Sequence, residues 1–219
     1  MANLLLIVAA GTGTRLGRGE PKALVPLAGR PLLSWTLEAF APMAFERTVV
    51  TAPPDRLADF TRLVGARASV VAGGQSRSAS VRRGFEALAA ADGDVVAVHD
   101  AARPFLTADE IRAVLRAAQE SGAAIAATPV VDTIKKVASG RILQTVDRAD
   151  LYGAATPQAF RAEVLRRALA DGGEATDEAA LCESLGIPVS IVPVSRRSFK
   201  ITTPEDLELA EAILERGRR

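Results

Sequence analysis

The chain has 219 residues, of which 48% are hydrophobic and 24% are charged, and its formal net charge is +1. This size suits one substantial domain with its own core, and the near-neutral charge argues against binding nucleic acid by charge alone. No apolar run approaches the ~20 residues that span a bilayer, Leu4–Val8 is too short for a signal peptide, and the single cysteine excludes a disulfide framework. We therefore expect a cytoplasmic protein with no nucleic-acid or membrane partner.

Apolar runs typical of β-strands alternate with amphipathic helical patterns along most of the chain. The predicted strands are Asn3–Ala9, Arg47–Thr51, Ala68–Ala72, Asp94–His99, Ala123–Thr128, Val189–Val194 and Phe199–Thr202. The predicted helices are Pro31–Ala41, Asp55–Val64, Ser78–Ala90, a helix capped by Thr107 that runs to Gln119, the stretch TDEAALCESLG (176–186) and a helix that begins at Thr203-Pro204. This alternation indicates an α/β fold with a mostly parallel central sheet covered by helices on both faces.

The segment from Val130 to Ala155 breaks this alternation, because no helical period develops in it. It resembles two strands joined at Ala138-Ser139-Gly140. One interpretation is an edge hairpin that lies on the sheet. The other, which we favour, is a projecting β-arm over residues 130–155, which needs a partner surface because an isolated hairpin is only marginally stable. The favoured interpretation predicts a homodimer formed through the arm.

A glycine-rich loop, GTGTRLG (11–17), follows the first predicted strand, where phosphate-binding loops are common. Its third glycine comes one position too late for the dinucleotide fingerprint, and the loop lacks the Gly-Lys-Ser/Thr of a Walker motif. The backbone N–H groups around Gly11 and Gly13 could still cradle phosphates, with Arg15 and Lys22 closing over a triphosphate. The alternative is a glycine-rich turn with two surface cations.

The stretch HDAARPF (99–105) ends a predicted central strand, at the edge of the sheet where α/β proteins bind ligands. Asp100 could hold Mg²⁺ and Arg103 could bind a phosphate bidentately, or the two residues could simply pair with each other. We interpret His99 as structural, because the sequence offers no companion groups for nucleophilic or zinc chemistry beside it.

A second glycine-rich stretch, AGGQSRSASV (72–81), lies between a predicted strand and a predicted helix. The pair Gly73-Gly74 would let a flat base approach the backbone closely, and Ser80 could hydrogen-bond to the edge of that base. A loop followed by an ordinary helix cap explains the same residues equally well.

Together these stretches closely resemble the 2-C-methyl-D-erythritol 4-phosphate cytidylyltransferase family. The matching motifs follow in order along nearly the whole chain: AAGTGTRLG…PK, GGQSRSASV, VHDAARPF, PVVDTIK, TVDR, TPQAF, TDEA and KITTPEDL. The resemblance implies a Rossmann-like nucleotidyltransferase fold, a single cytidylyltransferase domain over residues 1–219 and a homodimer whose protruding β-arm completes the neighbouring site. It also implies transfer of CMP from CTP to methylerythritol phosphate, with release of pyrophosphate, in non-mevalonate isoprenoid synthesis.

The resemblance further implies a role for each matched residue. Arg15 and Lys22 would stabilise the transition state, and Arg148 and Lys200 would position methylerythritol phosphate. The nucleotide would contact Ala10, Gly11, Gly13, Gly74 and Ser80. The acceptor pocket would comprise Asp100, Ala101, Arg103, Thr133 and Thr156, with Arg148, Thr133 and Thr156 supplied across the dimer. Mg²⁺ would bridge the CTP phosphates, with Asp100 as its candidate protein ligand.

Two other functions stay open from the sequence. A ribitol 5-phosphate cytidylyltransferase would share Arg15 and Lys22, and it would differ in the pocket around Thr133, Arg148 and Thr156. A catalytically silent nucleotide-binding module on the same fold is the second alternative, since a fold does not fix a function.

Overall fold

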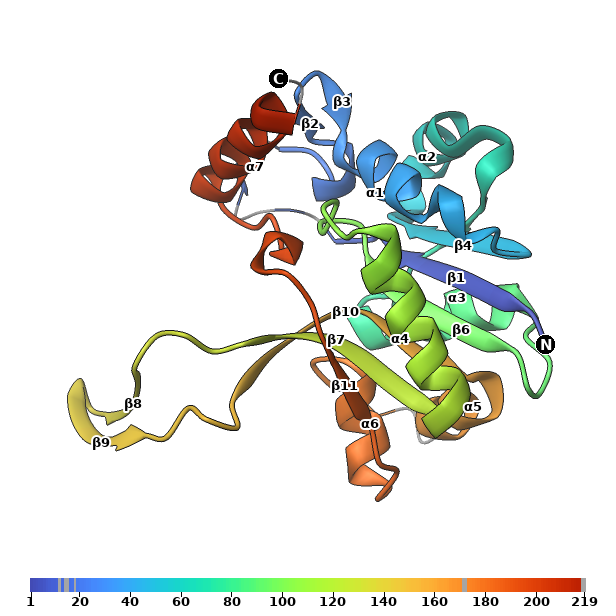
Figure 1. Cartoon of the computed structure of the whole chain (residues 1–219). Helices are drawn as coiled ribbons and strands as arrows, with labels where there is room; N and C mark the ends of the chain where they lie inside the picture. The colour runs from blue at the N-terminus through green and yellow to red at the C-terminus, as the bar shows by residue number, and fades with distance from the viewer. Residues whose placement is uncertain (12, 14–15, 18, 171–172, 218–219) are drawn as a thin grey trace.

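A computed structural model describes the chain except for residues 12, 14–15, 18, 171–172 and 218–219. A seven-stranded sheet crosses the molecule in the order β11-β7-β10-β6-β1-β4-β5 (Figure 1). Its strands are β1 (Asn3–Val8), β4 (Arg47–Ala52), β5 (Ser69–Ala72), β6 (Val95–Asp100), β7 (Ala123–Pro129), β10 (Tyr152–Arg161) and β11 (Ser190–Pro193). Strand β10 runs antiparallel to both of its neighbours and the other ladders are parallel, so the predicted mostly parallel α/β sheet is confirmed.

Strand β1 lies between β4 and β6 because its side chains are apolar on both faces. Leu5 and Ile7 belong to the core on one face of the sheet, and Leu4 and Leu6 belong to the core on the other. Each of these four residues exposes 2% or less of its surface. The run Asn3–Val8 is therefore a strand buried on both sides, which is typical of parallel sheets.

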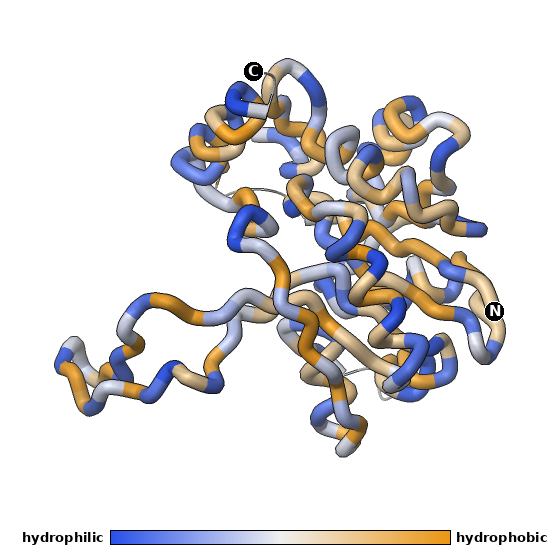
Figure 2. Tube along the Cα trace, in the orientation of Figure 1, coloured by the Kyte–Doolittle hydropathy of each residue, from blue (hydrophilic) through white to orange (hydrophobic). Residues whose placement is uncertain are grey.

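Helices cover both faces of the sheet and make three layers (Figure 1). Helices α1 (Leu32–Phe40), α2 (Leu57–Val64) and α4 (Ala108–Ser121) contribute to the core on the Leu5 face. Helices α3 (Arg77–Leu88), α5 (Ala162–Ala170) and α6 (Glu178–Ser184) contribute to the core on the Leu4 face. The hydrophobic colouring in Figure 2 accordingly follows the central strands. Among the described residues, every helix is too short or too polar to cross a membrane.

A third core cluster joins the first loop to the end of the chain. Helix α7 (Pro204–Gly217) contributes Leu207 to this cluster, where it packs with Leu16 and Ile201 beside the short ribbon of β2 (Pro26–Leu27) and β3 (Arg30–Pro31). The Ile201 N–H donates to the carbonyl oxygen of Ala102 at 2.9 Å. This bond fixes the segment that carries Lys200 next to the carboxyl end of β6.

Most predicted helices and strands are confirmed, and α4 shows why. Thr107 Oγ1 accepts the Glu110 N–H at 3.2 Å, and a Glu110 carboxylate oxygen accepts the Thr107 N–H at 2.8 Å, so the predicted capping box forms. The strand predicted at Phe199–Thr202 is wrong: this segment joins the body through Ile201 and forms no ladder within the described residues. Helix α5, strand β10 and the two-residue strands β2 and β3 are helices and strands that the sequence analysis did not predict.

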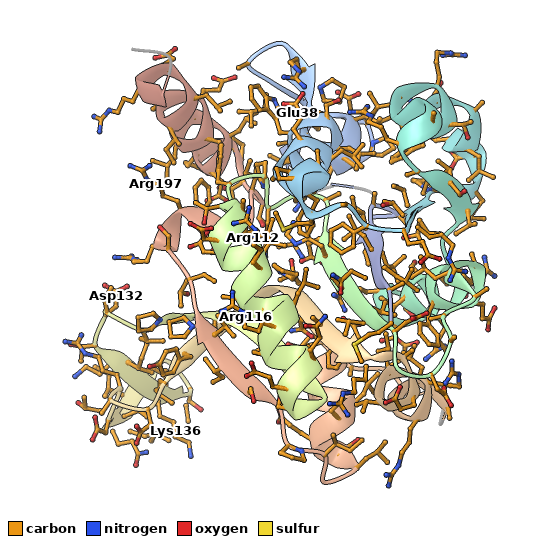
Figure 3. All side chains as sticks on the ribbon, turned by 45° about the vertical axis from the view of Figure 1, so that its right-hand side comes forward. Glu38, Arg112, Arg116, Asp132, Lys136 and Arg197 are labelled. Atoms are coloured by element: carbon orange, nitrogen blue, oxygen red, sulfur yellow. The ribbon has the colours of Figure 1, made fainter. Side chains whose placement is uncertain are left out.

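Strands β8 (Ile134–Ala138) and β9 (Arg141–Val146) form a separate hairpin that stands away from the body (Figure 1). Ser139 and Gly140 make the turn with positive φ angles of 49° and 73°. At the base of the hairpin, the Val130 N–H donates to the Leu151 carbonyl at 3.0 Å. The side chains of the arm, including the labelled Asp132 and Lys136, stand clear of the three core layers (Figure 3).

Candidate active site

A cleft of about 380 Å³ lies at the carboxyl ends of β1 and β6. Both predicted glycine-rich loops line this cleft. The first follows β1 and the second follows β5, and these strands run parallel within the sheet, so their carboxyl ends lie at the same edge. The C-terminal segment closes it with Lys200. The predicted site residues that line the cleft are Ala10, Gly11, Gly13, Lys22, Gly74, Ser80, Asp100, Ala101 and Lys200.

Position 13 must be a glycine because the first loop folds back and brings Lys22 against it. Its φ is +70°, which L side chains rarely adopt, and a Cβ at this position would lie 2.9 Å from the backbone nitrogen of Lys22. The Leu16 N–H donates to the Gly13 carbonyl at 2.9 Å and tightens the turn. The missing side chain therefore lets Lys22 enter the cleft against the glycine backbone.

The second loop approaches the first equally closely at Gly73. A Cβ on Gly73 would overlap that of Ala10, so only glycine allows the two loops to touch. Ser80 Oγ accepts the Gly74 N–H at 3.0 Å and donates to the Ser76 carbonyl at 2.9 Å. Ser80 thus orders the loop from within, which the sequence did not predict.

Asp100 is surrounded by cations. Its Oδ2 accepts a hydrogen bond from Lys200 Nζ at 2.7 Å, its Oδ1 lies 3.4 Å from Arg77 Nε, and Arg103 Nε lies 3.9 Å from Oδ2. Burial opposes ionisation, but the charges of Lys200 and Arg77 outweigh it and hold the pKa of Asp100 well below its usual range. The ionised carboxylate organises the surrounding cations for an anionic ligand.

A hydrogen-bonded chain beneath the cleft holds the β6 end in place. The Asp100 N–H donates to Thr156 Oγ1 at 3.0 Å, and Thr156 Oγ1 lies 3.0 Å from His99 Nδ1. Because a carbonyl oxygen can only accept, Nε2–H donates to the Arg103 carbonyl at 3.0 Å, and in the neutral ring Nδ1 then accepts the hydrogen of the Thr156 hydroxyl. Burial lowers the pKa of His99 to about 4, so the ring is neutral and structural, as predicted.

The other predicted residues lie away from the cleft wall. Thr156 is buried under Asp100 of its own chain, which corrects the expectation that it is supplied across the dimer. Arg103 is mostly buried and donates to the Ser198 carbonyl at 2.8 Å. Thr133 and Arg148 belong to the exposed arm, where Arg148 donates to the Val131 carbonyl. Arg15 lies outside the described residues.

The sequence analysis missed Arg77, which lines the cleft, and its partner Glu178. Arg77 Nη1 and Nη2 donate to Glu178 Oε1 and Oε2 at 2.6 and 3.0 Å. Burial lowers the pKa of Arg77, but Glu178 and Asp100 outweigh it and the pKa is raised. Burial also raises the pKa of Glu178, against the opposing effect of Arg77. Both residues belong to motifs that the sequence analysis had identified, GGQSRSASV and TDEA. They were missed because each resembles the first residue of an ordinary helix.

The cleft does not fit a preformed magnesium site. Within the described residues, His, Cys, Asp and Glu side chains do not gather in any group of three or more that could hold a metal. Of the described residues that line the cleft, Asp100 is the one carboxylate, and its two oxygens already face Lys200 and Arg77. Mg²⁺ takes oxygen ligands in near-octahedral geometry. The predicted role of Asp100 as a magnesium ligand therefore finds no support in this arrangement.

A Rossmann-like sheet with two glycine-rich loops and converging cations at its strand ends defines a nucleotidyltransferase. The family model described as 2-C-methyl-D-erythritol 4-phosphate cytidylyltransferase matches residues 4–216. The chain belongs to this family. It is 42% identical to the enzyme of that name from Syntrophotalea carbinolica, with 98% of this chain and 97% of the relative covered. It is 47% identical to the one from Paraburkholderia phymatum, with 97% and 96% covered.

Solved structures of proteins with this name share the fold. The crystal structure of the Thermus thermophilus protein is 39% identical, covers 98% of this chain and 100% of its own, and superposes with a TM-score of 0.81. The Francisella tularensis structure is 29% identical, covers 97% of this chain and 99% of its own, and gives a TM-score of 0.84.

Proposed function

We propose that this chain, as a cytoplasmic homodimer, transfers CMP from CTP to the phosphate of 2-C-methyl-D-erythritol 4-phosphate and releases pyrophosphate. One observation carries the proposal: Lys22 against the Gly13 turn, the Gly74 loop and the Asp100–Lys200 pair all meet in a single cleft. Membership of the family agrees with it. We propose the whole of residues 1–219 as one catalytic domain that bears the arm at residues 130–155.

In this reaction an oxygen of the acceptor phosphate attacks the α-phosphorus of CTP, opposite the leaving pyrophosphate. One P–O bond forms as the bond to the α–β bridging oxygen breaks, and the electron pair departs with pyrophosphate. The acceptor phosphate is already anionic at neutral pH, so no general base is needed. This suits a site that offers cations and backbone N–H groups and keeps His99 neutral and hydrogen-bonded.

We propose that Lys22 and Arg15 of the same loop stabilise the negative charge that grows on the triphosphate in the transition state. We assign Lys200, held on Asp100, to the acceptor phosphate, which places the two lysines on different substrates. The backbone of Ala10, Gly11 and Gly74 faces the cytidine, and Ser80 orders that loop.

Magnesium enters this proposal as part of the substrate, in the Mg–CTP complex. Mg²⁺ usually keeps several waters and binds the phosphates of a nucleotide, so it needs few protein ligands. A phosphate-and-water shell suits a cleft whose described carboxylate, Asp100, already faces Lys200 and Arg77.

Exposed apolar residues on the arm support the proposed homodimer. Val137 and Ile142 are cross-strand partners with 54% and 65% of their surfaces exposed, and Leu143 beside them is 60% exposed. Exposed apolar patches of this kind mark protein interfaces. A second copy of the chain that covers this arm would bring its own arm, with Thr133 and Arg148, to the neighbouring cleft.

Pyrophosphate release by the purified chain tests the function. CTP, UTP, ATP and GTP are each combined with methylerythritol phosphate, with ribitol 5-phosphate or with no acceptor, in the presence of magnesium. We expect release only with CTP and methylerythritol phosphate. Release with ribitol 5-phosphate instead would show that the proposed acceptor is wrong and that the chain is a ribitol 5-phosphate cytidylyltransferase. A folded protein that binds CTP but releases no pyrophosphate with any acceptor would be a catalytically silent nucleotide-binding module.

A further inference from the structure

Arg77 and Glu178 form a buried ion pair at the wall of the cleft, and the proposed reaction assigns a role to neither. Only 1% of the Glu178 side chain and 23% of the Arg77 side chain are exposed. Removing two charges from water costs free energy that their mutual attraction often fails to recover. Stability alone therefore does not explain this pair.

The guanidinium of Arg77 reaches beyond Glu178 to the reaction centre. Two of its nitrogens donate to Glu178, and Nε lies 3.4 Å from Asp100 Oδ1. The other oxygen of Asp100 accepts the hydrogen bond from Lys200 at 2.7 Å. Glu178, Arg77, Asp100 and Lys200 thus form an alternating row of charges that ends at the proposed acceptor phosphate.

The far end of this row is anchored in the body of the protein. Gln158 Oε1, on β10, accepts the backbone N–H groups of Glu178 and Ala179, each at 3.1 Å. Gln158 Nε2 donates to Asp177 Oδ2 at 2.9 Å, and Asp177 Oδ1 caps α6 by accepting the Ala180 N–H at 3.0 Å. The TDEA motif therefore holds the carboxylate of Glu178 in a fixed place.

We propose that Arg77, anchored by Glu178, is a positioning residue that fixes the Asp100 carboxylate and, through it, the ammonium of Lys200 beside the acceptor phosphate. This inference rests on the proposed function. Without Arg77, one oxygen of Asp100 loses its cation, so the carboxylate can turn and Lys200 turns with it. Arginine suits this task because its planar fork can contact two carboxylates at once, whereas lysine presents a single compact charge.

The test replaces both members of the pair, Arg77→Leu with Glu178→Leu. Replacing a whole buried pair by apolar groups avoids the stranded charge that a single substitution leaves, so we expect a folded protein. Arg82→Leu is the matched control, because Arg82 lies on the same helix and pairs with Glu174 at 3.4 Å, and neither residue lines the cleft. Arg77→Lys is a second variant, which keeps a charge near Glu178 but loses the fork.

Steady-state kinetics with both substrates separates positioning from a structural role. For the double variant and for Arg77→Lys, we expect KM for methylerythritol phosphate to rise about tenfold or more, and KM for CTP to change less than about threefold. The Arg82→Leu protein should match wild type. A purely structural role would lower the folded fraction and hence kcat, with both KM values unchanged, and that result would overturn the inference. Failure of the wild-type chain itself to release pyrophosphate would instead overturn the proposed function.

Discussion

Lys22 and Lys200 reach the cleft from opposite ends of the sequence and meet different surroundings there. Lys200 is held on the Asp100 carboxylate at 2.7 Å, whereas Lys22 lies against the backbone turn at Gly13. A cation beside backbone N–H groups suits a triphosphate, and a cation held by a carboxylate suits a second, singly phosphorylated ligand. The two side chains should therefore respond differently to substitution.

Lys22→Ala removes charge stabilisation from the transition state and leaves the backbone cradle intact. We expect turnover to fall by a factor of at least ~10², while CTP still raises the melting temperature, though by less than in wild type. Pyrophosphate release and thermal unfolding with and without CTP measure the two effects. Unchanged turnover would remove Lys22 from the mechanism.

His99 makes the stability of the protein depend on pH. Burial lowers its pKa from 6.5 to about 4, so below pH 6.5 the unfolded chain takes up a proton that the native chain does not. The free energy of unfolding should therefore fall as the pH drops from 6.5 towards 4, by up to roughly 3 kcal/mol. Urea unfolding at a series of pH values measures this slope.

The chain has one histidine, so its imidazole resonances can be assigned without ambiguity. Asp100, whose pKa is also lowered, affects stability only in the more acidic range where unfolded carboxylates titrate. Glu178, whose pKa is raised by burial, contributes with the opposite sign, because its native carboxyl holds a proton to higher pH than the unfolded one. His99→Gln should therefore remove the loss of stability on acidification from pH 6.5 to 5. A native imidazole that titrates near pH 6.5 would contradict the prediction.

At the scale of elements, the arm differs from the rest of the fold in having no layer packed over it within the described part of the chain. Strands β8 and β9 pair with each other, and Val137 and Ile142 lie opposite one another with most of their surfaces exposed. A two-stranded hairpin is marginally stable by itself, and the proposed dimer would supply the contacts that this arm lacks. In that proposal, the stability of the arm and the formation of the dimer depend on each other.

Replacing Val137 and Ile142 together by serine should dissociate the proposed dimer and lower turnover with it, because the arm loses its apolar contacts. Sedimentation velocity reports the mass, and pyrophosphate release reports the activity, at the same protein concentration. Leu209→Ser provides the control, since Leu209 is 53% exposed on α7, outside the arm. A variant that stays dimeric and fully active would show that these residues do not form the interface.

The sequence predicted elements with local signals and missed those that depend on distant contacts. Helix α4 was predictable because Thr107, Glu110 and Gly122 mark its ends within the segment itself. Strand β10 was not, because Ala155–Phe160 is a run of mostly small and polar residues that is buried only when β6, β7 and the helices α4 and α5 pack around it. Within the site, the motifs indicated the loops and lysines. The contact of Arg77 with Glu178 joins residues 101 positions apart and depends on the assembled fold.

At the scale of the whole molecule, the residues assigned to one reaction fall into two groups in the described structure. Lys22 and Lys200 line the cleft, whereas Arg148 lies on the arm outside it. In a symmetric dimer each cleft would therefore combine the lysines of one chain with the arm of the other.

Mixing the inactive variants Lys22→Ala and Arg148→Ala tests this sharing of sites. A hybrid dimer carries one site with both substitutions and one with neither, so equal mixing should restore about a quarter of wild-type activity. Subunit exchange is verified first by mass spectrometry of differently tagged chains. If the mixture contains hybrid dimers and still releases no pyrophosphate, the sites are not shared.

The cleft is completed by a segment from near the end of the chain. This segment is held by the hydrogen bond from Ile201 to Ala102 and by the packing of Leu207 with Leu16. Lys200 leaves the ribosome after every strand of the sheet has been made, because β11 ends at Pro193. A domain generally folds as a unit, so the nearly complete chain must be made before the cleft holds both of its lysines. The proposed acceptor site, which depends on Lys200, is therefore the last part of the cleft to be synthesised.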